Sequence, residues 1–101
     1  MRSVPKSFEL LGHEITVEFR DDLLAEKEAW GMCHFQSGLI ELQAPLRELR
    51  VTKAHVLATF WHEFFHMALY LLGRTDMALD EELVDQLGQA MLQFHKTKQF
   101  S

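Results

Sequence analysis

An uninterrupted stretch without glycine or proline, from Lys53 to Leu72, is the feature that most constrains this chain of 101 residues. Thr52 is a suitable N-cap before it, and Gly73 is a suitable stop after it. The stretch predicts a helix of about 20 residues and about 30 Å. Apolar residues occur nearly all round this helix, which is typical of a central helix covered on several sides. The rest of the chain must therefore supply the covering layers.

The same predicted helix carries the sequence HEFFH, with His62 and His66 four residues apart and Glu63 directly after the first histidine. Residues four apart lie above one another on a helix, so both imidazoles can aim at one point. Neutral nitrogen ligands with a neighbouring carboxylate are what zinc-dependent hydrolysis requires. One ion would also satisfy two imidazoles in apolar surroundings. Structural histidines with polar atoms facing solvent are the alternative interpretation.

A catalytic zinc site needs a third protein ligand. The extended metzincin pattern requires glycine at position 69 and histidine at position 72, and Leu69 and Leu72 exclude it. Glu81 is the favoured candidate, because Asp85 four residues later can orient a ligand histidine. Glu81 also lies on the same helical side as Gly88, where a missing side chain lets two helices approach closely.

Other acidic residues in this region keep the third ligand open. Asp76, Glu82 and Asp85 are alternative ligands to Glu81. The run Asp80 to Glu82 also suits a helix N-terminus, with Asp80 as the cap and the carboxylates favoured by the helix dipole. We expect this last helix to pack beside the central one through an apolar stripe. The stripe consists of Leu83, Val84, Leu87, Met91 and Phe94.

The first half of the chain has the pattern of strands. In residues 13–20, HEITVEFR, apolar and polar residues alternate, which predicts a strand with one face on a core. The preceding residues 7–12, SFELLG, belong either to the same strand or to a hairpin partner. Residues 21–30, DDLLAEKEAW, have no sustained period and stay unassigned between a helical turn and a loop.

A second hairpin is expected where residues 31–35 and 39–42 flank Gln36-Ser37-Gly38. Pro45 then closes the second strand, since it cannot donate a ladder hydrogen bond. We expect one α+β domain over residues 1–101, with a small antiparallel sheet of about three strands packed on the central and C-terminal helices.

Charge and cysteine content limit the other functions. The formal net charge is −5 and the pI about 5.6, which is not the basic footprint of a nucleic-acid or anionic-membrane binder. Cys33 is the only cysteine, which excludes an internal disulfide and a cysteine zinc cluster and suits a reducing compartment. No signal-peptide core or membrane span is evident. We therefore expect a soluble, cytoplasmic protein.

Residues 8–95 resemble the small ImmA/IrrE-type zinc peptidases of the gluzincin kind, common in phages and mobile elements. The resemblance lies in a strand-like GLIEL, a helix with HEFFH and a following helix that opens with DEELVDQLG. It implies a zinc endopeptidase that cuts a regulatory protein such as a repressor. His62, His66 and Glu81 would then be the metal ligands, and Glu63 the general base.

Two further expectations concern the substrate and the alternatives. An extended peptide substrate would lie antiparallel to an edge strand, and the LIEL segment, residues 39–42, is the preferred one. Tyr70, His34 and His55 are expected to be structural. A zinc-stabilised interaction module without turnover, and a metal-free interaction protein, are the competing functions. The oligomeric state stays open.

Overall fold

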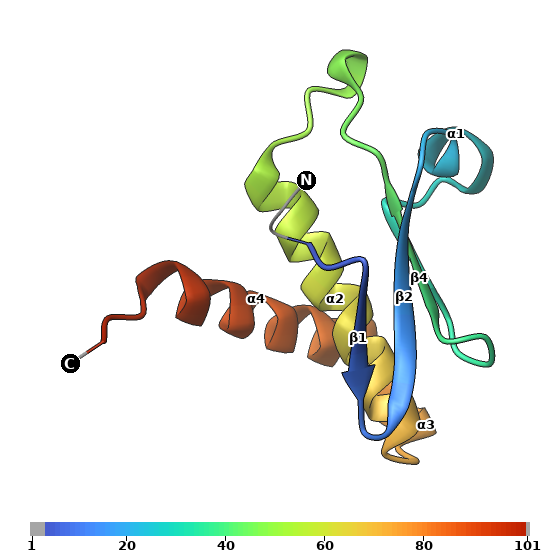
Figure 1. Ribbon diagram of the computed structural model, residues 1–101, viewed down its shortest axis with the longest axis vertical. Coiled ribbons are helices and arrows are strands. Elements are labelled where there is room, and N and C mark those ends of the chain that lie inside the picture. Colours follow the sequence, from blue (N-terminus) through green and yellow to red (C-terminus); the bar gives the residue numbers. More distant parts are fainter. Residues whose placement is uncertain (1–3, 101) are drawn as a thin grey trace.

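The computed structural model describes residues 4–100, so residues 1–3 and 101 of the expected domain lie outside it. These residues form an α+β fold in which a mixed sheet packs on a long central helix (Figure 1). The elements in chain order are β1 (Ser7–Leu10), β2 (His13–Arg20), α1 (Leu23–Lys27), β3 (Gly31–His34), β4 (Leu39–Gln43), a 3-10 turn η1 (Arg47–Leu49), α2 (Lys53–Leu71), α3 (Thr75–Ala78) and α4 (Glu81–Thr97). The α+β class is confirmed.

The sheet has four strands in the order β1-β2-β4-β3, which corrects the expected antiparallel sheet of about three strands. The β1–β2 and β3–β4 pairs are antiparallel, but β2 and β4 are parallel, with Val17 opposite Ile40. The extra strand arises because Leu11 and Gly12, with φ of 52° and 84°, form a tight turn that makes SFEL a hairpin partner. The parallel pair arises because β4 inserts between β2 and β3.

One face of the sheet forms the core against α2. The predicted alternation of β2 is confirmed at Ile15 and Val17, which are buried while Thr16 and Glu18 are exposed. It fails at the third apolar position, because Phe19 near the end of the strand is 36% exposed. Side chains from strands and helix meet in this core. Its buried members are Val4, Ile15, Val17, Ile40, Leu42, Val56, Phe60 and Met67.

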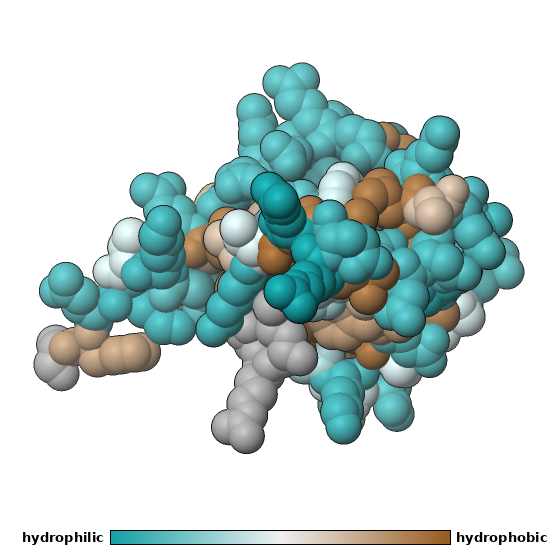
Figure 2. All heavy atoms as spheres, turned by 90° about the horizontal axis from the view of Figure 1, so that it is seen from above, coloured by the Kyte–Doolittle hydropathy of each residue, from teal (hydrophilic) through white to brown (hydrophobic). Residues whose placement is uncertain are grey.

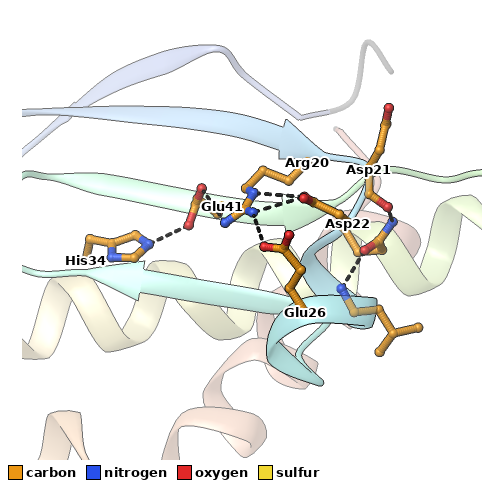
Figure 3. Close-up of polar contacts among 8 residues, drawn as sticks. Arg20, Asp21, Asp22, Glu26, His34 and Glu41 are labelled. Carbon is orange, nitrogen blue, oxygen red and sulfur yellow. Dashed lines mark hydrogen bonds and ion pairs between the residues drawn. The ribbon is translucent and has the colours of Figure 1, made fainter.

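The opposite face of the sheet carries a network of charges (Figure 3). Glu41 is 9% exposed there, with its Oε1 2.6 Å from His34 Nε2 and its Oε2 3.6 Å from an Arg20 nitrogen. Arg20 also pairs with Asp22 and Glu26 at 3.0 Å each. The network thus connects β2, β3 and β4 with α1.

Helix α1 occupies part of the segment that the sequence left unassigned. Leu23 at its start is fully buried, and the Leu24 N–H donates to Gln43 Oε1 at 2.7 Å. Gln43 Nε2 in turn donates to the Asp21 carbonyl at 2.8 Å. A short helix without a hydrophobic period is therefore held by tertiary contacts with β4.

The two long helices begin as predicted. Thr52 Oγ1 accepts a hydrogen bond from the His55 N–H, and Asp80 Oδ1 accepts one from the Leu83 N–H. No helix in the part of the chain that the structure describes is long and apolar enough to cross a membrane.

Phe94 is 59% exposed, so its assignment to a buried stripe was wrong. The reason is that the C-terminal end of α4 projects away from the body, and this projection is largely hydrophilic (Figures 1 and 2).

Helix α4 crosses α2 in close contact at Gly88, as the sequence predicts. A Cβ atom placed on Gly88 would lie 3.1 Å from the His62 backbone nitrogen and 3.4 Å from its Cα. These are backbone atoms inside a helix, so they cannot rotate away as a side chain would. The distance between the two helices therefore depends on the missing side chain.

We predict that Gly88→Leu lowers the free energy of unfolding by about 1–3 kcal/mol, because a large side chain there forces the two helices apart. Ala90→Leu is the matched control, since Ala90 is exposed on the same helix, and it should change stability by less than about 0.5 kcal/mol. Urea denaturation of both variants measures the difference. Equal free energies of unfolding for the two variants would show that the stability of the protein does not depend on this close contact between the helices.

Candidate metal centre

Three side chains converge where the start of α4 meets the middle of α2. His62 Nε2 lies 3.1 Å from His66 Nε2 and 2.9 Å from Glu81 Oε2. His66 Nε2 lies 3.2 Å from the other carboxylate oxygen of Glu81. His66 is buried, whereas the Glu81 side chain is 72% exposed. The cluster therefore has one side in the protein and one open side.

The outer ring nitrogens of both histidines have partners of their own. His66 Nδ1 donates to the Ala78 carbonyl in α3, and His62 Nδ1 lies 3.5 Å from Asp85 Oδ1. A carbonyl only accepts, so a neutral His66 carries its proton on Nδ1 and its lone pair on Nε2. On the inner side, His62 Nε2 lies 2.9 Å from Glu81 Oε2 and 3.1 Å from His66 Nε2. A cation held between these atoms would bind the carboxylate and the imidazole nitrogens at once.

The distances are close to those of a metal site. Ligand atoms held tetrahedrally about 2.0–2.2 Å from one ion lie about 3.3–3.6 Å from each other. The separations of 2.9, 3.1 and 3.2 Å among His62, His66 and Glu81 are a few tenths of an ångström shorter, and the three residues could hold a metal ion. Protons can also occupy such a cluster, because an imidazolium at His62 would donate to Glu81. A metal titration distinguishes the two.

The structure separates Glu81 from the other acidic candidates. The group of possible ligands found among the described residues contains Glu81 and not Glu82, Asp76 or Asp85. Glu82 is exposed on α4, Asp76 is exposed on α3, and Asp85 faces the outer nitrogen of His62. Asp85 thus occupies the orienting position that the sequence suggested for it.

Glu63, beside the first histidine, is 7% exposed, and it lines the cavity at the cluster. Burial raises the pKa of its carboxyl to about 7, with His66 lowering that pKa and Glu81 raising it. A carboxyl with such a pKa both takes up and releases a proton near neutral pH.

The cavity in front of the cluster has a volume of about 600 Å³. It lies between β3, the middle of α2 and the start of α4. The residues that line it include Trp30, Gly31, Met32, Cys33 and Phe35 from β3 and its flanks, His55, Ala58 and Thr59 from α2, and Leu79, Asp85 and Gln89 beyond the metal ligands. The chemistry of the cluster is thus open to a molecule about the size of a short peptide segment.

The strand at this cavity is not the expected one. The LIEL segment forms β4, which pairs with β2 on one side and β3 on the other, so the choice of LIEL as the edge strand was wrong. The edge strand is β3, because the hairpin folds back with its second strand inside the sheet. Among residues 4–100, the edge of the sheet beside the cavity therefore belongs to β3, Gly31–His34.

Several residues of the site have no signal in the sequence. The Ala78 carbonyl and the neighbouring Leu79 are placed by the turn through α3, and only the tertiary structure brings them to His66. Tyr70 stacks on Phe35 with ring centroids 4.5 Å apart, as expected of a packed aromatic. His55 lies edge-on to Trp30 at 4.7 Å.

Comparison of the chain with protein-family models, with curated proteins and with solved structures gives no match.

We predict that the protein binds about one zinc ion per chain and that Glu81→Ala weakens this affinity by at least about 10- to 100-fold. Glu82→Ala, the adjacent matched control, should have little effect, and Asp85→Ala should fall between them because it loosens His62 without removing a ligand. Calorimetric zinc titrations give the affinities, and thermal melts should show the zinc-loaded form to be more stable. A larger loss for Glu82→Ala or Asp76→Ala would move the third ligand there.

We predict that Cys33 is a protected thiol. Burial, and to a lesser extent the nearby Glu63, raises its pKa to about 12, so iodoacetamide at pH 8 should react at least about 100-fold more slowly than with the urea-unfolded chain. The unfolded thiol ionises near pH 8.5 while the folded one stays protonated, so the free energy of unfolding should fall as the pH rises from about 8.5 to 12. Equal alkylation rates would contradict this.

Proposed function

We propose that the protein is a zinc-dependent endopeptidase. The observation that carries the proposal is the convergence of His62, His66 and Glu81 within hydrogen-bond distance of one another, with the buried Glu63 beside them in an open cavity. Two imidazoles and one carboxylate are a ligand set that favours zinc and leaves a coordination position open.

The residues of the chain have separate roles in this mechanism. His62, His66 and Glu81 would hold a zinc ion, which would supply Lewis-acid chemistry toward water and a peptide carbonyl. Glu63 accepts the proton of the attacking water and returns it to the leaving amine. Asp85 and the Ala78 carbonyl hold the two imidazoles in orientation through their outer nitrogens.

The substrate is an extended segment of peptide or protein. The outer edge of β3 has no partner strand among residues 4–100, so its backbone groups are available to a peptide that adds to the sheet. This edge borders the cavity that contains Glu63 and the ligand cluster. A peptide paired with β3 would therefore pass in front of the reactive groups.

The resemblance to ImmA/IrrE-type peptidases supports the same function and suggests a regulatory protein, such as a repressor, as substrate and the cytoplasm as location. A zinc-stabilised interaction module is the competing function. A structural zinc site has no use for a buried carboxylate next to its ligands, and Glu63 is such a carboxylate. The position of Glu63 thus favours the enzyme.

We predict that Glu63→Gln keeps zinc and fold but lowers peptide cleavage by about 10²- to 10⁴-fold, because an amide cannot accept the proton. Glu48→Gln, which changes an exposed carboxyl in η1, is the control and should cleave normally. Digestion of casein peptides followed by mass spectrometry measures the rates. If Glu63→Gln cleaves at the wild-type rate, Glu63 is not the base. If the wild-type protein binds zinc but cleaves no peptide, the interaction module is favoured.

A further inference from the structure

The groove at the metal centre has a direction set by two contacts between β3 and α2. Trp30, just before β3, lies edge-on to His55 near the start of α2, with ring centroids 4.7 Å apart. Phe35, just after β3, stacks on Tyr70 near the end of α2, with centroids 4.5 Å apart. Strand and helix therefore run in the same direction, with the metal ligands between the two aromatic contacts.

This direction orients a peptide that adds to the free edge of β3, an interpretation that rests on the proposed peptidase function. Antiparallel pairing is the more stable arrangement of two strands. A peptide antiparallel to β3 has its N-terminal part near Phe35 and its C-terminal part near Trp30. The residues that precede the scissile bond then lie at the Phe35 end.

The Phe35 end of the groove is apolar on both walls. Phe35 supplies one wall, held in place by its stacking on Tyr70. Leu79 also lines the cavity, and the preceding residue, Ala78, accepts the hydrogen bond of His66, which lies one helical turn before Tyr70. Leu79 is 65% exposed, so a large apolar area adjoins the metal ligands.

The opposite end of the groove combines apolar and polar groups. Trp30 lies there against His55, and Ala58, one turn along α2 from His55, lines the same cavity. Asp85 and Gln89 line the cavity from α4. Covering these imidazole, amide and carboxylate groups with an apolar side chain would cost free energy, because they would lose their hydrogen bonds to water. A side chain that follows the scissile bond would therefore meet both the Trp30 ring and polar groups.

We propose that Leu79 and Phe35 form a specificity contact for a large apolar side chain within two residues on the N-terminal side of the scissile bond. Burial of an apolar side chain between two such walls removes apolar area from water on both partners. An isolated exposed leucine needs no explanation. Leu79 differs because it borders the cavity in front of the ligand cluster.

The first measurement is a cleavage profile of the zinc-loaded wild-type protein on a mixture of proteome-derived peptides, with the sites read by mass spectrometry. We expect leucine, phenylalanine, methionine or isoleucine to be enriched at one of the two positions before the cut. The best-cleaved peptide and its counterpart with serine at that position then serve as a matched substrate pair.

The second measurement compares Leu79→Ser with Leu72→Ser, a control residue that is 58% exposed at the end of α2 and does not line the cavity. Leu79→Ser should raise KM about tenfold for the apolar peptide with little change in kcat, and it should leave the serine peptide unaffected. Leu72→Ser should behave as the wild type on both peptides.

The outcomes separate the two proposals. Cleavage without an apolar preference before the bond, or equal kinetics of the two serine variants, would overturn the specificity contact while the peptidase function stands. A zinc-loaded wild-type protein that cleaves no peptide would overturn both.

Discussion

The contact between Gly88 of α4 and the backbone of α2 at His62 is the constraint on which the candidate site depends. Without a Cβ at this position the two helices pack backbone against backbone. Glu81 lies seven residues, or about two helical turns, before Gly88. The close crossing therefore brings the Glu81 carboxylate to 2.9 Å from His62, and a wider crossing would carry it out of reach of both imidazoles.

The short connection between α2 and α4 also positions groups at the candidate site. Gly73 takes a left-handed φ of 77° after α2, so the chain reverses and α3 lies against the end of α2. Its Ala78 carbonyl then reaches His66, and Asp85 from the first turns of α4 reaches His62. The outer nitrogens of both imidazoles thus face oxygen atoms supplied by the connection and by α4.

The sheet supplies the other side of the site. Gly31 of the edge strand packs directly on α2, where a Cβ would lie 2.7 Å from Thr59 Cγ2 and 3.0 Å from Glu63 Cγ. On the opposite face, His34 is paired with the buried Glu41 (Figure 3). The strand thus contacts neighbours on both faces, while its outer edge has no partner strand among residues 4–100.

The sequence by itself determined the features whose causes lie within a few residues. Helix α2, its Thr52 cap, the Asp80 cap of α4 and the stacking of His62 above His66 follow from capping and helical spacing. The alternation of β2 and the hairpin of β3 with β4 follow from period and turn chemistry in the same way.

Only the tertiary structure decided how these pieces are arranged. Strand order was not predictable, because an antiparallel meander and the observed insertion of β4 satisfy the same alternation of side chains. The edge strand at the cavity is therefore β3, and the LIEL segment lies inside the sheet as β4. Contacts between distant segments likewise decide three other features. These are helix α1, the exposed end of α4 at Phe94, and the position of Glu81 rather than Asp76 or Glu82 at the two histidines. Local propensity acts over one turn or one hairpin, whereas the packing of layers selects among arrangements that are locally equivalent.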